Sequence, residues 1–421
     1  MNRCLLVLML LLYAVRSWST PMQTAVLAAD VQTLRLSYAD SERMVERPFL
    51  MLGGTEQVMI SFDQMSHDVR NYSYRLVHCN ADWTPSDLQQ HEYQQGMPLN
   101  DITDYQTSLA TTQPYTHYWL KLPNEDVDFR VSGNYVVQIF EDNDPELVVA
   151  QVCLCVVMPQ VEIRMDARAN TDIELSGRYQ QLDIDIMLNG LMPHDVTTEM
   201  QLVVEQNGRL DNRVSLRQPN YITPRLLQYK NNRQLIFEGG NEYRRFDIAS
   251  TYLYGVGVEH IEYDGAAYHA YLEPCLLNTG RSYQTDYDVD GRYVINAERV
   301  HYDVDTEADY IWVHWFVPTK TPWLDSRLYI GGDLCFNTLS AENMMQYKAK
   351  EGGYVFTKLL KQGGYNYQLW LQQKGRKAAT TQRTEGSYWQ TENEYTAYLY
   401  YRPQGERYDQ LIGIQRLRTN L

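Results

Sequence analysis

The chain has 421 residues, with 37 basic and 53 acidic side chains and a formal net charge of −16. This length predicts about two to four domains, each large enough to bury a core. The acidic balance argues against a nucleic-acid binder, whose phosphate contacts need clustered Lys and Arg, and against basic attachment to anionic lipid. The 34 Tyr against 9 Phe favour β structure with many half-exposed rings.

The N-terminus has the pattern of a secretory signal peptide. A positively charged start at Arg3 precedes the apolar run Cys4–Val15, and a small residue follows at Ser17. The run is too short to span a membrane. Its cysteine, Cys4, stands at the start of the apolar run, whereas the acylated cysteine of a lipoprotein follows that run. We therefore expect residues 1–19 to be removed on export, with a membrane-anchored N-terminus as the alternative.

The segment 20–159 is dominated by period-two alternation, which is typical of strands with one buried face. We expect strands at Thr33–Tyr38, Gln57–Phe62, Tyr72–His78, His117–Leu122, Tyr135–Phe140 and Gln151–Val157. Turn residues separate these runs, which predicts a β-sandwich of immunoglobulin-like size.

The rest of the chain repeats the pattern, and no long amphipathic helix is predicted. Asn207-Gly208, after the run Met200–Gln206, is a hairpin turn signal, because both central residues of a type I′ turn need positive φ. Strands are expected at Val161–Met165, Gln181–Leu188, Met200–Gln206, Tyr268–Glu273, Tyr293–Asn296, Tyr310–Val317, Leu328–Ile330, Tyr354–Leu360, Tyr365–Leu371, Tyr395–Tyr401 and Leu411–Leu417. The prediction is an all-β chain of three tandem immunoglobulin-like or early-set β-sandwiches, at 20–159, 160–299 and 300–421.

Charge is unevenly distributed over these three segments. The net charge is −12 for residues 20–159, −7 for residues 160–300 and +1 for residues 301–421. A solvated surface explains such a distribution, and the alternative is an asymmetry that orients the protein on a partner.

Five cysteines follow the leader: Cys79, Cys153, Cys155, Cys275 and Cys335. Cys153 and Cys155 would project from one face of a strand about 6–7 Å apart, which is poor disulfide geometry. No zinc spacing is present. We interpret all five as small, buried apolar residues.

The chain offers little catalytic or metal-binding chemistry. Asp286–Gly291 matches the start of a calcium loop, but position 12 is Ala297 where a bidentate Glu is required, so an acidic hairpin or inter-domain turn is favoured. His91 is followed by Gln95 where a zincin has its second His. Proximity of His78, Asp82 and Ser86 in sequence does not define a triad. We expect no enzyme activity, no metal and no cofactor.

Several runs resemble the plug proteins of the type IX secretion system, in the right order over residues 30–415. They are HCNADWTPS (78–86), SGNY (132–135), FEGGNEYRRFD (237–247), DYDVDG (286–291), ADYIWVHW (308–315), LLKQGGYNYQ (359–368), EGSYWQTENEY (385–395) and YYRPQGERYDQLIG (400–413). Gly364 departs from the pattern, where a second aromatic is expected, and we expect it to alter a turn only.

Most of these motif residues are expected to maintain the fold, with Trp83 as a core anchor and Gly239-Gly240 as a turn that needs positive φ. The motif residues are His78, Asp82, Trp83, Ser86, Gly239, Gly240, Asn241, Phe246, Asp247, Asp286, Asp290, Gly291, Lys361, Gln362, Gly363, Glu385, Gly386, Glu392, Asn393, Tyr395 and Asp409. The sequence does not identify the residues of a partner interface.

The resemblance implies a non-enzymatic periplasmic subunit of the secretion system, associated with the outer membrane. It would block the periplasmic mouth of the large translocon barrel (SprA/Sov-type) and be mutually exclusive with the cargo-shuttle barrel (PorV-type). It would not itself span the membrane, and no nucleic acid or small-molecule substrate is expected.

A second resemblance, over Tyr329–Met345 and the following strands, is to early-set sandwiches that include glycogen-binding modules. The alternative function is therefore an exported glycan-binding protein, with sugars stacked on exposed Trp323, Trp370 or Trp389. A third possibility, an integral outer-membrane barrel, is disfavoured, because such chains usually end on an aromatic strand residue and this one ends at Leu421.

Overall fold

A computed structural model describes residues 21–40, 47–285 and 288–419. The described chain is nearly all β, as expected, and its helices are single turns. No helix in these ranges has the length and apolar character needed to cross a membrane. The expected leader, residues 1–19, lies outside the described residues.

Residues 25–157 form a first unit of two packed sheets. One sheet has the order β1-β12-β11-β5-β7 with β3 beside β12, the other has the order β2-β4-β9-β8, and β6 and β10 form a small ribbon. The strands are β1 Ala25–Val26, β2 Val31–Tyr38, β3 Phe49–Met51, β4 Val58–Gln64, β5 Tyr72–Cys79, β6 Gln94–Gly96, β7 Asn100–Ile102, β8 Asp104–Thr107, β9 Thr116–Leu122, β10 Val127–Phe129, β11 Gly133–Glu141 and β12 Val148–Val157, and the helix is α2 Gln90–Tyr93. Inward side chains such as Ile60, Leu76 and Val137 form its core.

A second unit, called the middle unit, combines residues 162–238 with the last two strands of the chain. Its sheets have the orders β13-β14-β18-β17, with β19 beside β14, and β16-β15-β29-β30. Its elements are β13 Glu162–Arg168, β14 Tyr179–Met187, α3 Val196–Glu199, β15 Met200–Gln206, β16 Val214–Leu216, β17 Tyr221–Ile222, β18 Leu226–Tyr229, η1 Arg233–Leu235, β19 Ile236–Glu238, β29 Glu394–Tyr401 and β30 Gln410–Arg418.

The third unit lies between these two parts of the middle unit in sequence. Strands β20, β23 and β25 pair with β28, and a second sheet has the order β21-β22-β24-β27-β26. Its elements are β20 Arg244–Asp247, β21 Val258–Tyr263, β22 Tyr268–Leu272, β23 Tyr293–Ile295, α4 Val304–Glu307, β24 Tyr310–Pro318, β25 Ser326–Gly331, η2 Asp333–Cys335, η3 Ala341–Asn343, β26 Gln346–Lys348, β27 Gly353–Lys361 and β28 Gly363–Gln373. Trp315 and Phe246 pack edge to face in its core.

The expected boundary at residues 299 and 300 therefore does not match the strand pairing. β29 pairs with β15 over seven residues, from Met200 opposite Tyr401 to Gln206 opposite Tyr395. The core of the middle unit needs this pairing, because Tyr395, Ala397 and Leu399 pack with Leu202 and Val204 in one cluster. The third unit is thus an insertion in the middle unit, and local alternation carries no signal of such long-range pairing.

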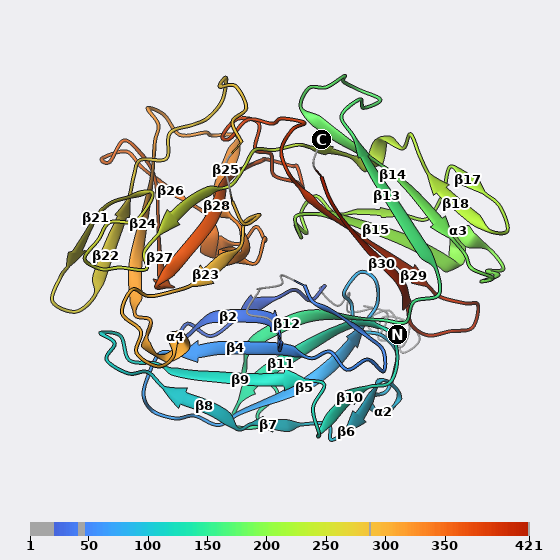
Figure 1. Cartoon of the computed structure of the whole chain (residues 1–421), viewed down its shortest axis with the longest axis horizontal. Helices are drawn as coiled ribbons and strands as arrows, with labels where there is room; N and C mark the ends of the chain where they lie inside the picture. The colour runs from blue at the N-terminus through green and yellow to red at the C-terminus, as the bar shows by residue number, and fades with distance from the viewer. Residues whose placement is uncertain (1–20, 41–46, 286–287, 420–421) are drawn as a thin grey trace, which may run out of the picture.

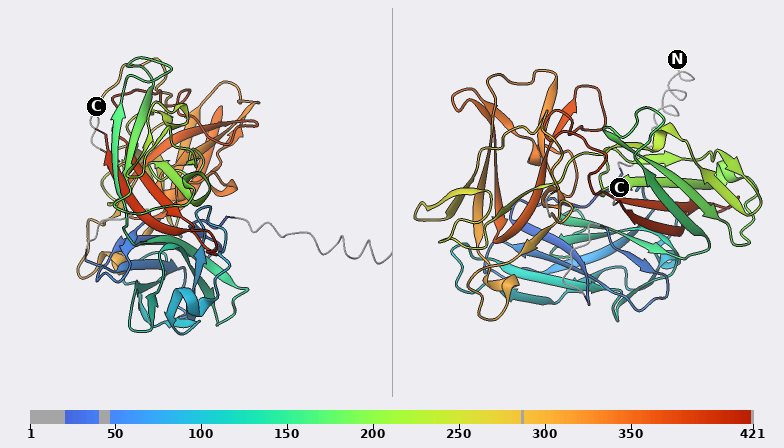
Figure 2. Two further views of the ribbon diagram at one scale, coloured as in Figure 1. Left: turned by 90° about the vertical axis from the view of Figure 1, so that its right-hand side faces the viewer. Right: turned by 45° about the horizontal axis from the view of Figure 1, so that its top comes forward.

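The three units meet in a triangle, with the first unit along the bottom of Figure 1, the third at upper left and the middle at upper right. The right-hand view of Figure 2 shows the middle and third units side by side above the first. Tyr dominates the interior: eight of the twelve largest fully buried side chains in the described ranges are Tyr. The Tyr content thus serves the cores and junctions as well as the surface.

Candidate functional site

The junctions between the units hold most of the family-like motif residues. Strand β12 shows how one junction forms, because both of its faces are buried. Val152, Leu154 and Val156 point into the core of the first unit, whereas Cys153 and Cys155 point the other way, toward the middle unit. The continuous apolar run in this strand thus reflects two packed faces.

At the junction of the first and middle units, Trp83 joins those cysteines in one apolar cluster with Tyr398 and Leu411 of the middle unit. Trp83 is 3 % exposed and has a φ of +67°, so the expected core anchor lies between two units. The Arg47 guanidinium lies 5.1 Å from the centre of its ring and pairs with the buried Glu205 of β15.

Hydrogen bonds join the first motif to the last at this junction. Asp409 Oδ2 accepts a bond from the Ala81 amide at 2.9 Å, and Asp409 Oδ1 accepts one from Arg402, which also donates to Asn80 Oδ1 at 2.7 Å. The Tyr400 hydroxyl donates to Asn134 Oδ1 at 2.8 Å. Segments more than 250 residues apart in the chain are thereby fixed side by side.

The remaining residues of the first motif shape the loop. His78 is buried, with Nδ1 at 2.8 Å from Ser86 Oγ, and Gly133 allows its ring to approach because a Cβ there would lie 2.3 Å from Nε2. Burial lowers the pKa of His78 to about 4. Asp82 is exposed and accepts hydrogen bonds from Thr84 in a local turn. His78, Asp82 and Ser86 therefore form no catalytic triad.

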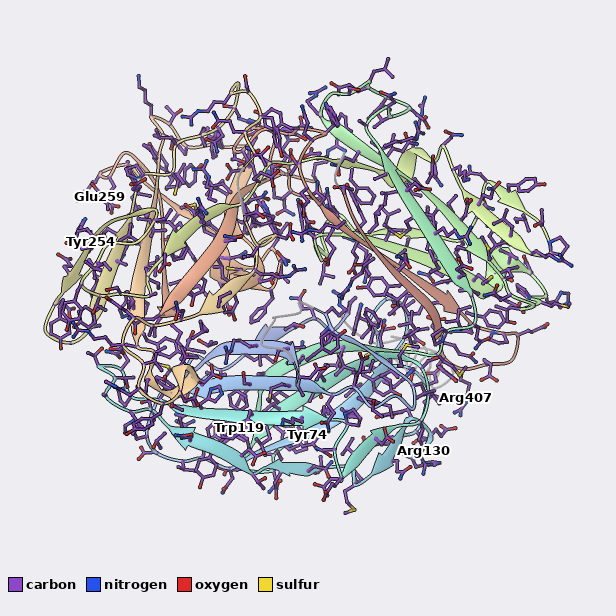
Figure 3. All side chains as sticks on the ribbon, viewed as in Figure 1. Tyr74, Trp119, Arg130, Tyr254, Glu259 and Arg407 are labelled. Carbon is purple, nitrogen blue, oxygen red and sulfur yellow. The ribbon has the colours of Figure 1, made fainter. Side chains whose placement is uncertain are left out.

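Arg407, labelled in Figure 3, extends the same junction at its outer edge. It reaches from the loop between β29 and β30 to the first unit, where it donates to the Asp87 carbonyl at 3.2 Å and pairs with Glu92.

At the junction of the middle and third units, the two connecting segments run together. The Tyr388 amide donates to the Gly240 carbonyl at 2.8 Å, and Asn241 Nδ2 donates to the Glu385 carbonyl at 3.0 Å. A Cβ on Gly239 would lie 2.0 Å from the Tyr388 carbonyl oxygen. Gly240 has the expected positive φ of +69°, but Gly239 does not, and Gly239 serves close backbone approach instead.

Glu385 forms the charged centre of this junction. Its carboxylate is fully buried and pairs with Arg244, whose Nη2 lies 2.8 Å from Oε2. It also accepts a hydrogen bond from the Leu369 amide at 2.9 Å. Burial opposes the charge of Arg244, but Glu385 outweighs burial and raises the pKa of that guanidinium. Gly386, with a φ of +89°, turns the chain next to it.

The other residues of these two motifs complete the seam. Asn393 Nδ2 donates to the Gly239 carbonyl at 2.8 Å, and the fully buried Tyr395 donates to Gln180 Oε1 at 2.8 Å. Glu392 pairs with Arg418 at the end of β30. Phe246 and Asp247 belong to β20 in the third unit, where Phe246 stacks on Tyr365 and Asp247 caps the Ala249 amide.

The described part of the acidic segment, residues 288–291, joins the same seam, as the favoured turn interpretation expects. Asp286 lies outside the described residues. Asp288 accepts a hydrogen bond from the Tyr243 amide at 2.5 Å, and Asp290 pairs with Arg418 at 2.7 Å. Burial raises the pKa of Asp290 to about 6 in spite of the arginines beside it. A Cβ on Gly291 would lie 2.6 Å from the Tyr243 ring.

The junction of the first and third units contains a buried ion pair. Lys361 Nζ lies 2.6 Å from Asp63 Oδ2, both side chains are fully buried, and the ammonium lies 4.2 Å from the centre of the Tyr115 ring. Asp63 also accepts hydrogen bonds from Tyr310 and His117 at 2.6 Å each. Burial alone would raise the pKa of Asp63, but Lys361 and His117 outweigh it and hold that pKa well below its usual range.

Gln362 and Gly363 continue this junction along the chain. Gln362 Oε1 accepts a hydrogen bond from the Asp309 amide at 2.8 Å, and Asp309 in turn caps the Thr112 and Gln113 amides of the first unit. A Cβ on Gly363 would lie 2.2 Å from the Val294 carbonyl oxygen. Gly364 lies within β28, so the expectation that it alters a turn is wrong.

Sequence reasoning missed the partners on the first unit, namely Asp63, Arg47 and Asp309 with its capped loop. Asp63 is the residue after Phe62 in β4, so its side chain points to the opposite face of the strand from the core. A polar residue on that face is expected to contact water. Here that face is covered by another unit.

Of the other expectations about chemistry, the one for the cysteines is confirmed and the one for Trp370 is wrong. The five cysteines are free and buried, as expected. Trp370 is fully buried, so the glycan hypothesis is wrong to treat it as exposed, and Trp323 packs against the core of the third unit. Among the described residues, no three His, Cys, Asp or Glu side chains are grouped to hold a metal ion.

Comparison with known proteins assigns the family. The model described as type 9 secretion system plug protein 1st domain matches residues 31–158, which is the first unit. This chain belongs to the type IX secretion system plug protein family. The crystal structure of a hypothetical protein from Parabacteroides merdae is 38% identical, covers 95% of this chain and 100% of that one, and has a TM-score of 0.92. All three units of the plug-family chain therefore share its fold.

Native alpha-2-macroglobulin from Escherichia coli, over domains NIE-MG1, is 10% identical and covers 48% of this chain and 98% of that one. Its TM-score of 0.15 supports no argument about this fold. No curated protein matches the chain.

Proposed function

We propose that this protein is a non-enzymatic periplasmic subunit that closes the periplasmic mouth of the outer-membrane translocon barrel of the type IX secretion system. It leaves the barrel when the cargo-shuttle barrel takes its place. Membership of the plug family supports the secretion system as the context. The observation that carries the proposal is the placement of the described motif residues, most of which lie in the junctions between the units or in their cores.

The three junctions make the chain one stiff body. Each unit contacts both of the others through apolar side chains, buried hydrogen bonds or ion pairs: Trp83 with Tyr398, Lys361 with Asp63, and Asp290 with Arg418. Two units joined by a single linker move freely unless their interface is large and hydrophobic, whereas three mutual contacts allow no hinge. A compact chain of this length has a radius of gyration of about 22 Å, which suits occlusion of a wide pore.

Three buried polar groups at the junctions, His78, Asp63 and Glu385, are engaged in structure. Burial lowers the pKa of His78 to about 4 and keeps the ring neutral against Ser86. Asp63 and Glu385 are each fully buried and each paired with a cation of another segment. A hydrolytic site needs a nucleophile and base facing a space for substrate, and these groups face protein.

A tagged chain expressed from its own locus tests the proposal. It is expected to co-purify with a high-mass outer-membrane barrel, and the yield is expected to fall in cells where the shuttle barrel is overproduced. Deleting the gene in cells that also lack the shuttle barrel should admit a large antibiotic or dye normally excluded by the outer membrane. Unchanged permeability in that double deletion would contradict the plugging function.

A further inference from the structure

The outward face of one sheet in the third unit holds a hydrogen-bonded pair of imidazoles, His269 and His314, which take no part in the junctions described above. In β22 and β24, Ala270 and Val313 are fully buried in the core, so His269 and His314 alternate to the opposite face. Tyr271 lies directly opposite His314 in the parallel register, which places His269 diagonal to it. Glu259 of β21, in the same sheet, lies at the left margin of the molecule, remote from the first and middle units (Figure 3).

The two imidazoles point ring nitrogens at each other. His269 Nδ1 lies 2.9 Å from His314 Nε2, with the ring centres 5.2 Å apart and the ring planes 17° apart. The outer nitrogens are held as well: His269 Nε2 lies 3.2 Å from Asp264 Oδ2, and His314 Nδ1 lies 3.0 Å from Thr357 Oγ1. The face is open to solvent, since the side chain of His269 is 21 % exposed.

The partners determine where the protons lie when both rings are neutral. A carboxylate only accepts hydrogen bonds, so His269 carries its proton on Nε2 and its Nδ1 is free to accept. His314 then donates from Nε2, and its Nδ1 accepts from the Thr357 hydroxyl.

We propose that His269 and His314 form a binding site for a divalent transition-metal ion such as zinc. Metal-bound histidines almost always donate their other ring N–H to a carboxylate or another acceptor, and both rings here have that second contact in place. Binding requires only that the proton of His314 move from Nε2 to Nδ1, where it donates to Thr357 in place of accepting. Two nitrogens at zinc–nitrogen distances and a tetrahedral angle are about 3.3 Å apart, so the pair opens by about 0.4 Å.

Two coordination positions remain for water or for an added carboxylate. Glu262 lies opposite His269 in the β21–β22 register, and its carboxylate accepts a hydrogen bond from Tyr271 at 3.0 Å. The aromatic stack of His260 on Tyr271 and of Tyr271 on His314, with centre distances of 4.6 and 4.4 Å, holds the His314 ring in place. The site is thus open on one side, where a side chain of a partner protein could complete the coordination sphere of the ion.

Calorimetric titration of the full chain with zinc chloride, in protein purified without a polyhistidine tag, tests the site. We expect one ion per chain, with His269→Gln and His314→Gln each weakening binding at least about tenfold. Asp264→Asn removes only the second contact and is expected to weaken binding by about tenfold. The matched control is His301→Gln, which changes an exposed imidazole of the third unit outside this sheet, and it should bind as the wild type does.

Crystals soaked in zinc give a second test that needs no variant. An anomalous peak between His269 Nδ1 and His314 Nε2 supports the site. Binding that is equal in wild type, His269→Gln and His314→Gln, or a peak elsewhere with none between these rings, overturns it. Since neither outcome depends on translocon closure, the metal site and the plugging function fail separately.

Discussion

Replacing Lys361 with Met removes the ammonium from the junction of the first and third units. Asp63 then remains fully buried with two donors, Tyr310 and His117, in place of three. Breaking a buried ion pair by removing one partner costs about 3–5 kcal/mol, against about 0–1 kcal/mol for an exposed pair. Because two donors remain, we expect the lower end, a loss of about 3 kcal/mol in the free energy of unfolding.

Urea unfolding followed by circular dichroism and tryptophan fluorescence measures this loss, with Lys348→Met as the control. Lys348 is half-exposed and pairs with nearby Glu351 on the surface, so its change should stay within about 0.5 kcal/mol. The double variant Asp63→Asn with Lys361→Met should recover at least about 1 kcal/mol relative to the sum of the single changes, because no buried charge is left unpaired. Equal midpoints for Lys361→Met and Lys348→Met would refute the reasoning.

The same pair predicts an acid response. A carboxyl whose pKa is lowered on folding contributes stability above its unfolded pKa, about 4, and that contribution is lost as the pH falls below it. The wild type should therefore lose stability steeply below pH 4. Lys361→Met should lose less over that range, because Asp63 no longer has the lysine to hold its pKa down. A steeper acid loss in the variant would contradict this assignment.

Three further predictions concern the other junctions. Gly239→Ala should cost about 1–3 kcal/mol in urea unfolding, because its Cβ would lie 2.0 Å from the Tyr388 carbonyl oxygen. Tyr400→Phe should cost about 1–2 kcal/mol, because Asn134 loses a buried donor at 2.8 Å; the same unfolding assay measures it. Burial raises the pKa of Glu242 to about 7, so the folded state binds more protons than the unfolded state between about pH 4.5 and 7. Stability should therefore fall as the pH rises through that window, by about 1–2 kcal/mol after solvent screening, and Glu242→Gln should flatten the melting-temperature profile there.

Matched controls distinguish these effects from general loss of packing. Gly364→Ala lies in β28 of the third unit, where a Cβ would meet nothing within 4 Å, and it should be neutral or slightly stabilising. If it costs as much as Gly239→Ala, close approach is not the cause. If the pH profile of Glu242→Gln is unchanged, the loss of stability between about pH 4.5 and 7 comes from other groups.

Local pattern predicted the strands well because alternation reflects which side of a strand is buried. The expected Tyr72–His78, His117–Leu122 and Gln151–Val157 correspond to β5, β9 and β12 with ends shifted by at most three residues. The Asn207-Gly208 signal was also confirmed, since both residues have positive φ, at +49° and +62°. However, the paired strand β16 begins only at Val214, so the turn does not close a two-residue hairpin.

The candidate site was predicted only in part. The motif residues were identified from the sequence, but their roles depend on which segments meet. Asp63 carries no local signal, because an outward-facing polar residue on a strand looks the same whether water or another unit covers it. Trp370 shows the converse, since a tryptophan suited to stacking on sugar is fully buried, with its indole N–H donating to Gln368.

The sequence by itself determined that this chain is acidic, β-rich and built of short alternating strands, because charge and alternation are local properties. Only the tertiary structure decided which strands share a sheet. When the units are taken as the sheets define them, residues 20–159 keep a net charge of −12, whereas the middle unit (160–243 and 390–421) and the third unit (244–389) each have −3. The gradient along the chain thus becomes one acidic unit under two nearly balanced ones, because β29 and β30 follow the inserted unit in sequence but join the sheet of the middle unit, with β29 paired to β15 and β30 paired to β29.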